Sequence, residues 1–166
     1  GEGLMRLRSV TLQPSETVAA SSRSLFFKPC ADGGFEFDTG ILRGRLRAGH
    51  KDGRSIGFSP VIHIPSGQRV DREGGFGLGS HYRVFANGKR FGDALWHTPC
   101  TAALQRKDVG VEVRWVATAD RPFEINAIYK IPAPDTLDIE TVVTATAELK
   151  GFESFLSSYF NNSFSN

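Results

Sequence analysis

Five residues whose side chains are suited to ligand binding lie close together in the sequence, between positions 81 and 97. They are His81, Arg83, Asp93, Trp96 and His97, and they lie on the two arms of one predicted hairpin and just beyond it. A guanidinium, a carboxylate and an imidazole can hold pairs of sugar hydroxyls, while an indole can cover the apolar face of a sugar ring. The combination therefore predicts a saccharide site, although the same residues are also typical of a solvated hairpin surface.

Other catalytic or cofactor chemistry has little support in the sequence. The four histidines, at positions 50, 63, 81 and 97, include no pair spaced as His-x-His or His-x-x-x-His, so each is more typical of a surface or structural histidine. Residues 74–79 are rich in glycine, but a strand-like segment follows them, whereas a phosphate-binding loop leads into a helix. No Gly-x-Ser-x-Gly motif is present. We expect no cofactor and no metal, and the sequence defines no catalytic residues.

The composition favours an all-β protein of one domain. The chain has 166 residues, enough to bury a core, and contains 13 Phe, 18 Gly and 8 Pro against a single Met. Many aromatic residues separated by turn formers are typical of short strands rather than of a helical bundle. No window repeats apolar residues at helical spacing, so we expect no helix longer than about two turns.

The charges are balanced and mostly scattered. Lys and Arg number 20 and Asp and Glu 18, a net charge of +2, which indicates no nucleic-acid partner. Arg43, Arg45 and Arg47 alternate with Leu42 and Leu46, so on a strand they would share one face. We interpret that face as solvated rather than as an anion-binding stripe.

Neither the cysteines nor the apolar runs define a cellular compartment. Cys30 and Cys100 could form one disulfide or remain two buried thiols, and the spacing does not decide between them. No apolar run approaches the roughly 20 residues of a membrane span, and no charged segment followed by an apolar one opens the chain as given. We expect no membrane partner, and the localisation stays undetermined.

The fold is organised by residues 109–160, where four consecutive runs alternate apolar and polar residues. This period of two predicts antiparallel strands with one buried face. Trp115 falls on the apolar face of the first run, so we expect it in the core. Asn87 and Gly88, between two strand-like runs, predict a type I′ hairpin, and Asp52 and Gly53 predict another.

Two of these runs also carry a resemblance to a known family. The first is residues 136–146, and the second is residues 152–161, which ends in Tyr159, Phe160 and Asn161. Together they resemble the middle of galactose mutarotase-like proteins, the aldose epimerases and carbohydrate-active enzymes built on a β-supersandwich. The resemblance implies a saccharide ligand and, for an enzyme, epimerase or glycoside-processing activity. Ser157 stands where that family has its catalytic histidine, so we expect no complete catalytic site.

Together these observations predict an antiparallel β-sandwich over residues 1–166, either a complete domain or part of a larger supersandwich. The expected function is saccharide binding or processing, and the alternative is a structural or interaction module without a small ligand. Residues 152–160 are apolar on both faces, which predicts an inner strand. If the segment instead lies at a sheet edge, it would be a template for pairing, so we also expect self-association through it.

Overall fold

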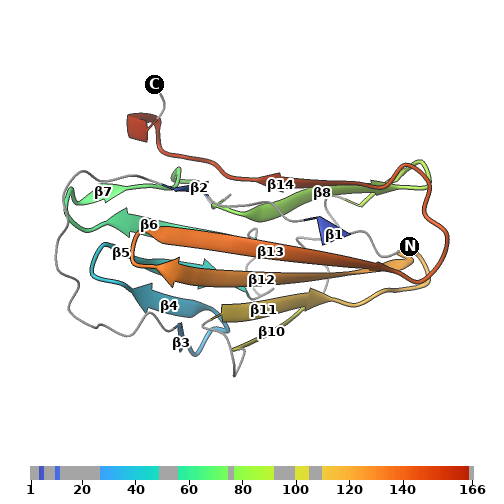
Figure 1. Cartoon of the computed structure of the whole chain (residues 1–166), viewed down its shortest axis with the longest axis horizontal. Coiled ribbons are helices and arrows are strands. Elements are labelled where there is room, and N and C mark those ends of the chain that lie inside the picture. Colours follow the sequence, from blue (N-terminus) through green and yellow to red (C-terminus); the bar gives the residue numbers. More distant parts are fainter. Residues whose placement is uncertain are drawn as a thin grey trace.

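The computed structural model describes residues 4–5, 10–11, 27–48, 56–74, 77–91, 100–104 and 110–164. Strands make up 60% of these described residues and helix 2%, and the sheets are antiparallel, so the all-β prediction is confirmed (Figure 1). The helix seen in these residues is one 3₁₀ turn, η1 (Asn162–Phe164). No helix in the described part of the chain could cross a membrane.

One layer of the molecule is a six-stranded sheet with the neighbour order β1-β13-β12-β11-β10, in which β2 also pairs with β13. Its strands are β1 (Leu4–Met5), β2 (Val10–Thr11), β10 (Thr101–Leu104), β11 (Gly110–Trp115), β12 (Phe123–Ala133) and β13 (Thr136–Ala145). The long β12 and β13 form a hairpin that runs along the long axis of the molecule (Figure 1).

The other layer contains two sheets. The five-stranded sheet consists, in order, of β3 (Lys28–Pro29), β4 (Phe35–Asp38), β5 (Leu42–Arg47), β6 (Gly57–His63) and β7 (Gln68–Arg69). The three-stranded sheet has the order β14 (Glu153–Ser157), β8 (Ser80–Ala86) and β9 (Lys89–Arg90). Single β-bridges, Phe58 to Leu78 and Asp71 to Phe160, join the two sheets.

The core follows from the alternation in the sequence. Every second residue of β12 from Phe123 to Ile131 is buried, and the residues between them are only partly buried. Trp115, at the end of β11, is also buried, as predicted. Because β12 lies between β11 and β13, its apolar side chains can be covered completely.

The two layers pack face to face through these buried residues. The Tyr129 ring meets the Phe58 ring edge to face at 5.4 Å between centroids, and its hydroxyl donates a hydrogen bond to the Gly79 carbonyl at 3.0 Å. Burial raises the pKa of the Tyr129 hydroxyl. At another point the Thr39 hydroxyl donates to the Pro134 carbonyl at 2.6 Å. A six-stranded layer packed on a second layer of sheets is a sandwich-like arrangement.

The hairpin predicted at Asn87 and Gly88 is confirmed. These two residues join β8 to β9, and their φ angles are 54° and 70°. Positive φ at both central residues is the property of a type I′ turn. The other predicted turn, at Asp52 and Gly53, lies outside the described residues, although the flanking β5 and β6 are antiparallel neighbours as expected.

The C-terminal strand β14 differs from its prediction. Residues 152–160 were expected to form an inner strand, but β14 pairs with β8 alone among the described strands. Phe152 packs against Phe123 with ring centroids 5.5 Å apart, whereas Phe155 is 47% exposed. The prediction is wrong because a pattern of apolar residues assigns side chains to faces without showing whether both faces are covered.

Two smaller expectations concern β5 and the cysteines. Leu42 and Leu46 are buried and Arg43 is exposed, but Arg45 and Arg47 are partly buried, so the predicted arginine face is solvated only in part. On that face Arg45 forms an ion pair with Asp32. Both Cys30 and Cys100 are free thiols, so the disulfide alternative is not formed.

Candidate functional site

His81, the first of the predicted ligand-binding residues, lies between the two layers. It is 3% exposed, its Nε2 lies 3.2 Å from the Thr141 hydroxyl of β13, and its ring meets Trp115 edge to face at 5.8 Å. Burial lowers the pKa of His81 to about 4. The side chain is therefore a neutral core histidine at physiological pH, placed to pack and hydrogen-bond inside the sandwich.

Arg83 lies only two residues further along β8 but points to the opposite face. In the pairing with β14, Phe155 is opposite Arg83 and the next residue, Leu156, is opposite His81. Tyr82 is thus an extra residue in β8, a β-bulge. Adjacent residues of the regular strand β14 point to opposite faces, and so do their partners. The bulge separates two side chains that a strict period of two would place together.

The three remaining predicted residues, Asp93, Trp96 and His97, lie outside the described residues. The structure therefore does not bring His81 and Arg83 into one site, and it does not describe whether the others approach either of them. A saccharide site that contains all five residues stays a prediction.

Arg83 belongs instead to a group of aromatic and charged residues on the outer face of the three-stranded sheet. Phe155 is directly opposite Arg83, and one row further along, Phe85 lies between Glu153 of β14 and Arg90 of β9. We call these five residues the β8–β14 face. Directly opposite residues in a sheet have Cβ atoms about 5 Å apart, so each aromatic ring has an arginine beside it.

The orientation of this face follows from burial. Val84 and Ala86, which alternate with the outward residues of β8, are 0% and 1% exposed and so point into the core. On the outer side, the rings of Phe85 and Phe155 meet edge to face at 5.9 Å. Phe155 is exposed over almost half its surface, which makes it an apolar contact point flanked by guanidinium and carboxylate groups.

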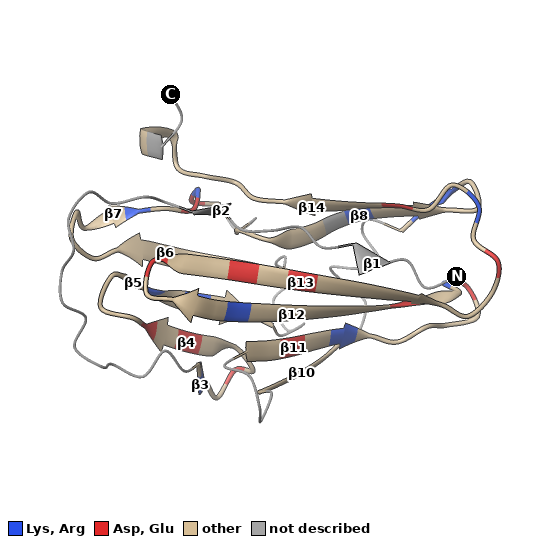
Figure 2. Ribbon diagram, viewed as in Figure 1, with Lys and Arg blue, Asp and Glu red and all other residues tan. Residues whose placement is uncertain are grey.

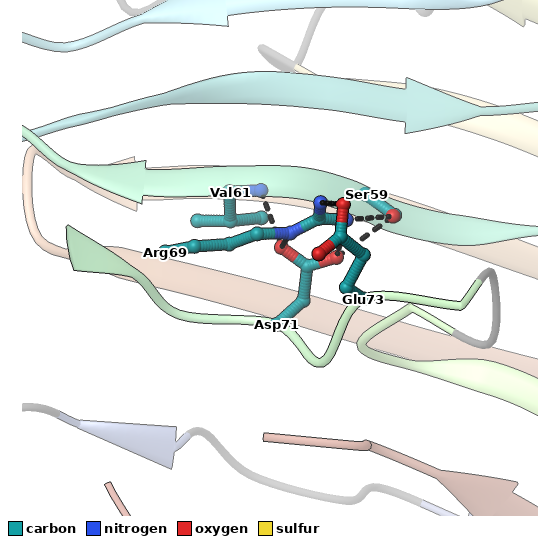
Figure 3. A network of polar contacts seen from close by, with 5 residues as sticks. All are labelled: Ser59, Val61, Arg69, Asp71 and Glu73. Atoms are coloured by element: carbon teal, nitrogen blue, oxygen red, sulfur yellow. Dashed lines mark hydrogen bonds and ion pairs between the residues drawn. The ribbon is translucent and has the colours of Figure 1, made fainter. Parts of the chain in front are cut away.

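A second polar cluster, around Asp71, was not predicted from the sequence (Figure 3). Asp71 is completely buried, and its Oδ1 accepts hydrogen bonds from the Val61 amide at 2.7 Å and from Arg69 Nε at 3.1 Å. Its Oδ2 accepts from the Ser59 hydroxyl at 2.7 Å and from Arg69 Nη2 at 2.9 Å. Arg69 also approaches Glu73 at 3.7 Å. No motif in the sequence marks this network.

The Asp71 cluster is built to hold strands together rather than to react. Both carboxylate oxygens are already occupied by donors from β6 and from Arg69, so the carboxylate is not available as a general base. The neighbouring backbone ties down the C-terminal segment, because the Arg72 amide donates to the Tyr159 carbonyl and the Asn161 amide donates to the Val70 carbonyl, each at 2.8 Å. The cluster therefore connects β6, β7 and the chain beyond β14.

Two further residues that could react are also engaged or shielded. The Ser157 hydroxyl donates to the Ser80 carbonyl at 3.3 Å, which is a structural contact within the sheet. Burial raises the pKa of the Cys100 thiol to about 11, so it stays protonated and is a poor nucleophile. The residues that the structure describes include no group of three His, Cys, Asp or Glu side chains able to hold a metal ion.

Comparisons of the chain with protein-family models, with curated proteins and with solved structures found no match. The resemblance to galactose mutarotase-like proteins therefore stays a prediction from the sequence.

Proposed function

We propose that the protein is a saccharide-binding β-sandwich of galactose mutarotase-like type, without a complete catalytic site, and that the saccharide lies on the β8–β14 face. The observation that carries this proposal is the position of Arg83 directly opposite the exposed Phe155. Arg83 is one of the residues that the sequence already suggested for sugar binding.

The chemistry of this face suits a sugar. An exposed phenylalanine ring can cover the C–H groups on the apolar side of a pyranose and lose its contact with water. The planar guanidiniums of Arg83 and Arg90 carry N–H donors in a fork that fits neighbouring hydroxyl oxygens. The Glu153 carboxylate supplies acceptors for hydroxyl protons, so one face offers all three kinds of contact.

Binding rather than catalysis is proposed because the residues expected to react are not in a reactive setting. Ser157 replaces the histidine that the resemblance implies, and a serine hydroxyl is not a proton donor near neutral pH. His81 is shielded in the core and neutral. Asp93, Trp96 and His97 lie outside the described residues, so their part in saccharide binding stays a prediction.

A glycan array probed with the purified chain tests the proposal, followed by calorimetric titration of the glycan that binds best. Arg83→Ala should weaken binding about tenfold or more, because hydrogen bonds from a charged donor are lost. Arg114→Ala is the matched control, because Arg114 is an exposed arginine that pairs with Glu124 on the outer face of the six-stranded sheet. This control should leave the affinity unchanged.

Trp96→Ala tests whether the predicted residues after β9 also belong to the saccharide site. Loss of binding in this variant as well as in Arg83→Ala would show that they do. If the purified chain binds no glycan on the array, saccharide binding is contradicted, and the alternative of an interaction module is favoured. An affinity that Arg83→Ala leaves unchanged while Trp96→Ala abolishes it would place the site away from the β8–β14 face.

A further inference from the structure

The hydrogen-bonding ladder defines the direction of the backbone groups in the three-stranded sheet. The Phe91 amide donates to the Val84 carbonyl at 2.8 Å, so the backbone groups of Val84 point toward β9. These groups alternate in direction along a strand, and those of Arg83 and Phe85 therefore point toward β14.

The same alternation identifies the groups at the outer edge of β14. Glu153 and Phe155 are the partners of Phe85 and Arg83, so their N–H and C=O groups point toward β8. The intervening Ser154 and Leu156 consequently direct theirs away from the sheet. No other described strand pairs with β14 on that side.

This edge lacks the features that usually prevent strand pairing. Natural edge strands are blunted by lysine, proline or a β-bulge. The strand Glu153–Ser157 contains no lysine or proline, and the bulge of this sheet is in β8. The exposed Phe155 lies at its centre.

We infer that β14 pairs with β14 of a second copy of this chain, antiparallel around a two-fold axis at Phe155. In this register Ser154 of each copy is opposite Leu156 of the other, and these residues exchange both backbone hydrogen bonds. Phe155 is opposite Phe155 in a non-hydrogen-bonded pair, where Cα atoms are about 4.5 Å apart and side chains are closest.

The second copy is the occupant because the strand is complementary to itself in this register. Glu153, the one charged residue of β14, is opposite Ser157 of the other copy, so the two carboxylates do not face each other. The two Phe155 rings cover one another, and a cross-strand aromatic pair stabilises an antiparallel ladder. The pairing joins two three-stranded sheets into one of six. Because it covers Phe155, dimerisation and saccharide binding on the β8–β14 face exclude each other, and the association is tested in the absence of saccharide.

Sedimentation velocity over a range of concentrations tests the association. The wild-type chain should form dimers, and Phe155→Lys should lower the association constant about tenfold or more, because it places two like charges opposite each other. Leu104→Lys is the matched control: Leu104 is 42% exposed and lies on β10, the outermost strand of the six-stranded sheet. A monomeric wild type, or a dimer disrupted by Leu104→Lys as well, would overturn the inference.

Disulfide trapping tests the register without changing Phe155. In a Cys30→Ser, Cys100→Ala background, the double variant Glu153→Cys with Ser157→Cys should oxidise to a covalent dimer, because these positions face each other at a distance that a disulfide spans. Within one strand the same positions are about 13 Å apart and cannot bridge. Each single variant should stay uncrosslinked.

Trapping in the Ser157→Cys single variant would show a different register and overturn the two-fold axis at Phe155. A double variant that dimerises reversibly but never crosslinks would overturn it too. Circular dichroism of each variant verifies that the strands are retained.

Discussion

The strands β12 and β14 both carry aromatic and aliphatic residues but have different surroundings. β12 lies between β11 and β13, and its inward residues from Phe123 to Ile131 are almost completely buried. β14 has one described neighbour, β8, and its central aromatic residue is exposed. The strands differ in apolar content and also in the number of strands that pair with them.

The number of neighbouring strands determines how tightly the side chains of a strand are constrained and whether they can contact a ligand. Two neighbours and a facing layer require the side chains of β12 to fit a closed space, so its pattern is strict. A single neighbour leaves β14 free to carry an aromatic side chain on its outer face, and it allows a bulge in β8 that turns Arg83 outward. Both proposals for this protein arise in this less constrained sheet.

The sharpest test of the comparison is a matched pair of phenylalanine substitutions. Phe123→Ala in β12 should lower the free energy of unfolding by about 3–5 kcal/mol, because it empties a fully packed site. Phe155→Ala in β14 should lower it by less than about 1 kcal/mol, because the ring, which meets the Phe85 ring edge to face, is already about half in water.

Urea denaturation of both variants measures these values, at a protein concentration low enough to keep the chain monomeric. The m-value should match the wild type in each case. Equal losses of stability would contradict the assignment of β14 to a lightly packed edge.

The buried His81 of β8 should make the stability of the protein depend on pH. The pKa of His81 is about 4 in the folded protein and 6.5 as its ordinary value, so the unfolded chain binds the proton more readily. The part of the free energy of unfolding that depends on neutral His81 is therefore fully present above pH 6.5. It falls by about 3 kcal/mol as the pH decreases toward and below 4. Thermal unfolding followed across this range measures the loss.

His81→Gln is the control, because glutamine retains hydrogen-bonding groups but does not titrate. The variant should lose the decrease between pH 6.5 and 4. The pKa of Asp32 is lowered from 3.8 to about 2, chiefly by its hydrogen bond with Arg45, so the stability that this carboxyl supplies is lost only as the pH falls from 3.8 toward 2. An unchanged pH profile in His81→Gln would mean that His81 is not the buried group responsible.

The sequence predicts those parts of the fold that depend on local patterns. The alternation from Phe123 to Ile131 predicts a buried strand face, and Asn87 with Gly88 predicts a hairpin, because periodicity and turn chemistry act over a few residues. The position of Arg83 could not be predicted in this way, because it depends on a bulge that appears only when β8 pairs with β14.

Long-range pairing explains the other differences as well. Asp71 lies in a polar stretch with no motif, and its burial requires β6, β7 and the C-terminal segment to meet around it. The edge position of β14 depends equally on which strands are its neighbours. Chemistry that depends on two distant segments meeting is not visible in the order of residues alone.

The smallest expected effect concerns the hairpin between β8 and β9. Its turn is determined by the local sequence, although the sheet around it is less constrained. Gly88 has a φ of 70°, and a Cβ built there would meet no atom within 4 Å. Any loss of stability on substitution therefore comes from backbone strain rather than from a clash. Gly88→Val should lower the free energy of unfolding by about 1 kcal/mol or somewhat more, because a β-branched residue is strained at positive φ.

Gly88→Asn separates strain from side-chain bulk. Asparagine tolerates the left-handed region, so this variant should lose only a few tenths of a kcal/mol although its side chain is of similar size. Thermal unfolding of the two variants beside the wild type gives the comparison. Equal melting temperatures for Gly88→Val and the wild type would mean that the turn relaxes to another type at no cost, and the hairpin would then be held by the pairing of β8 with β14 rather than by its own sequence.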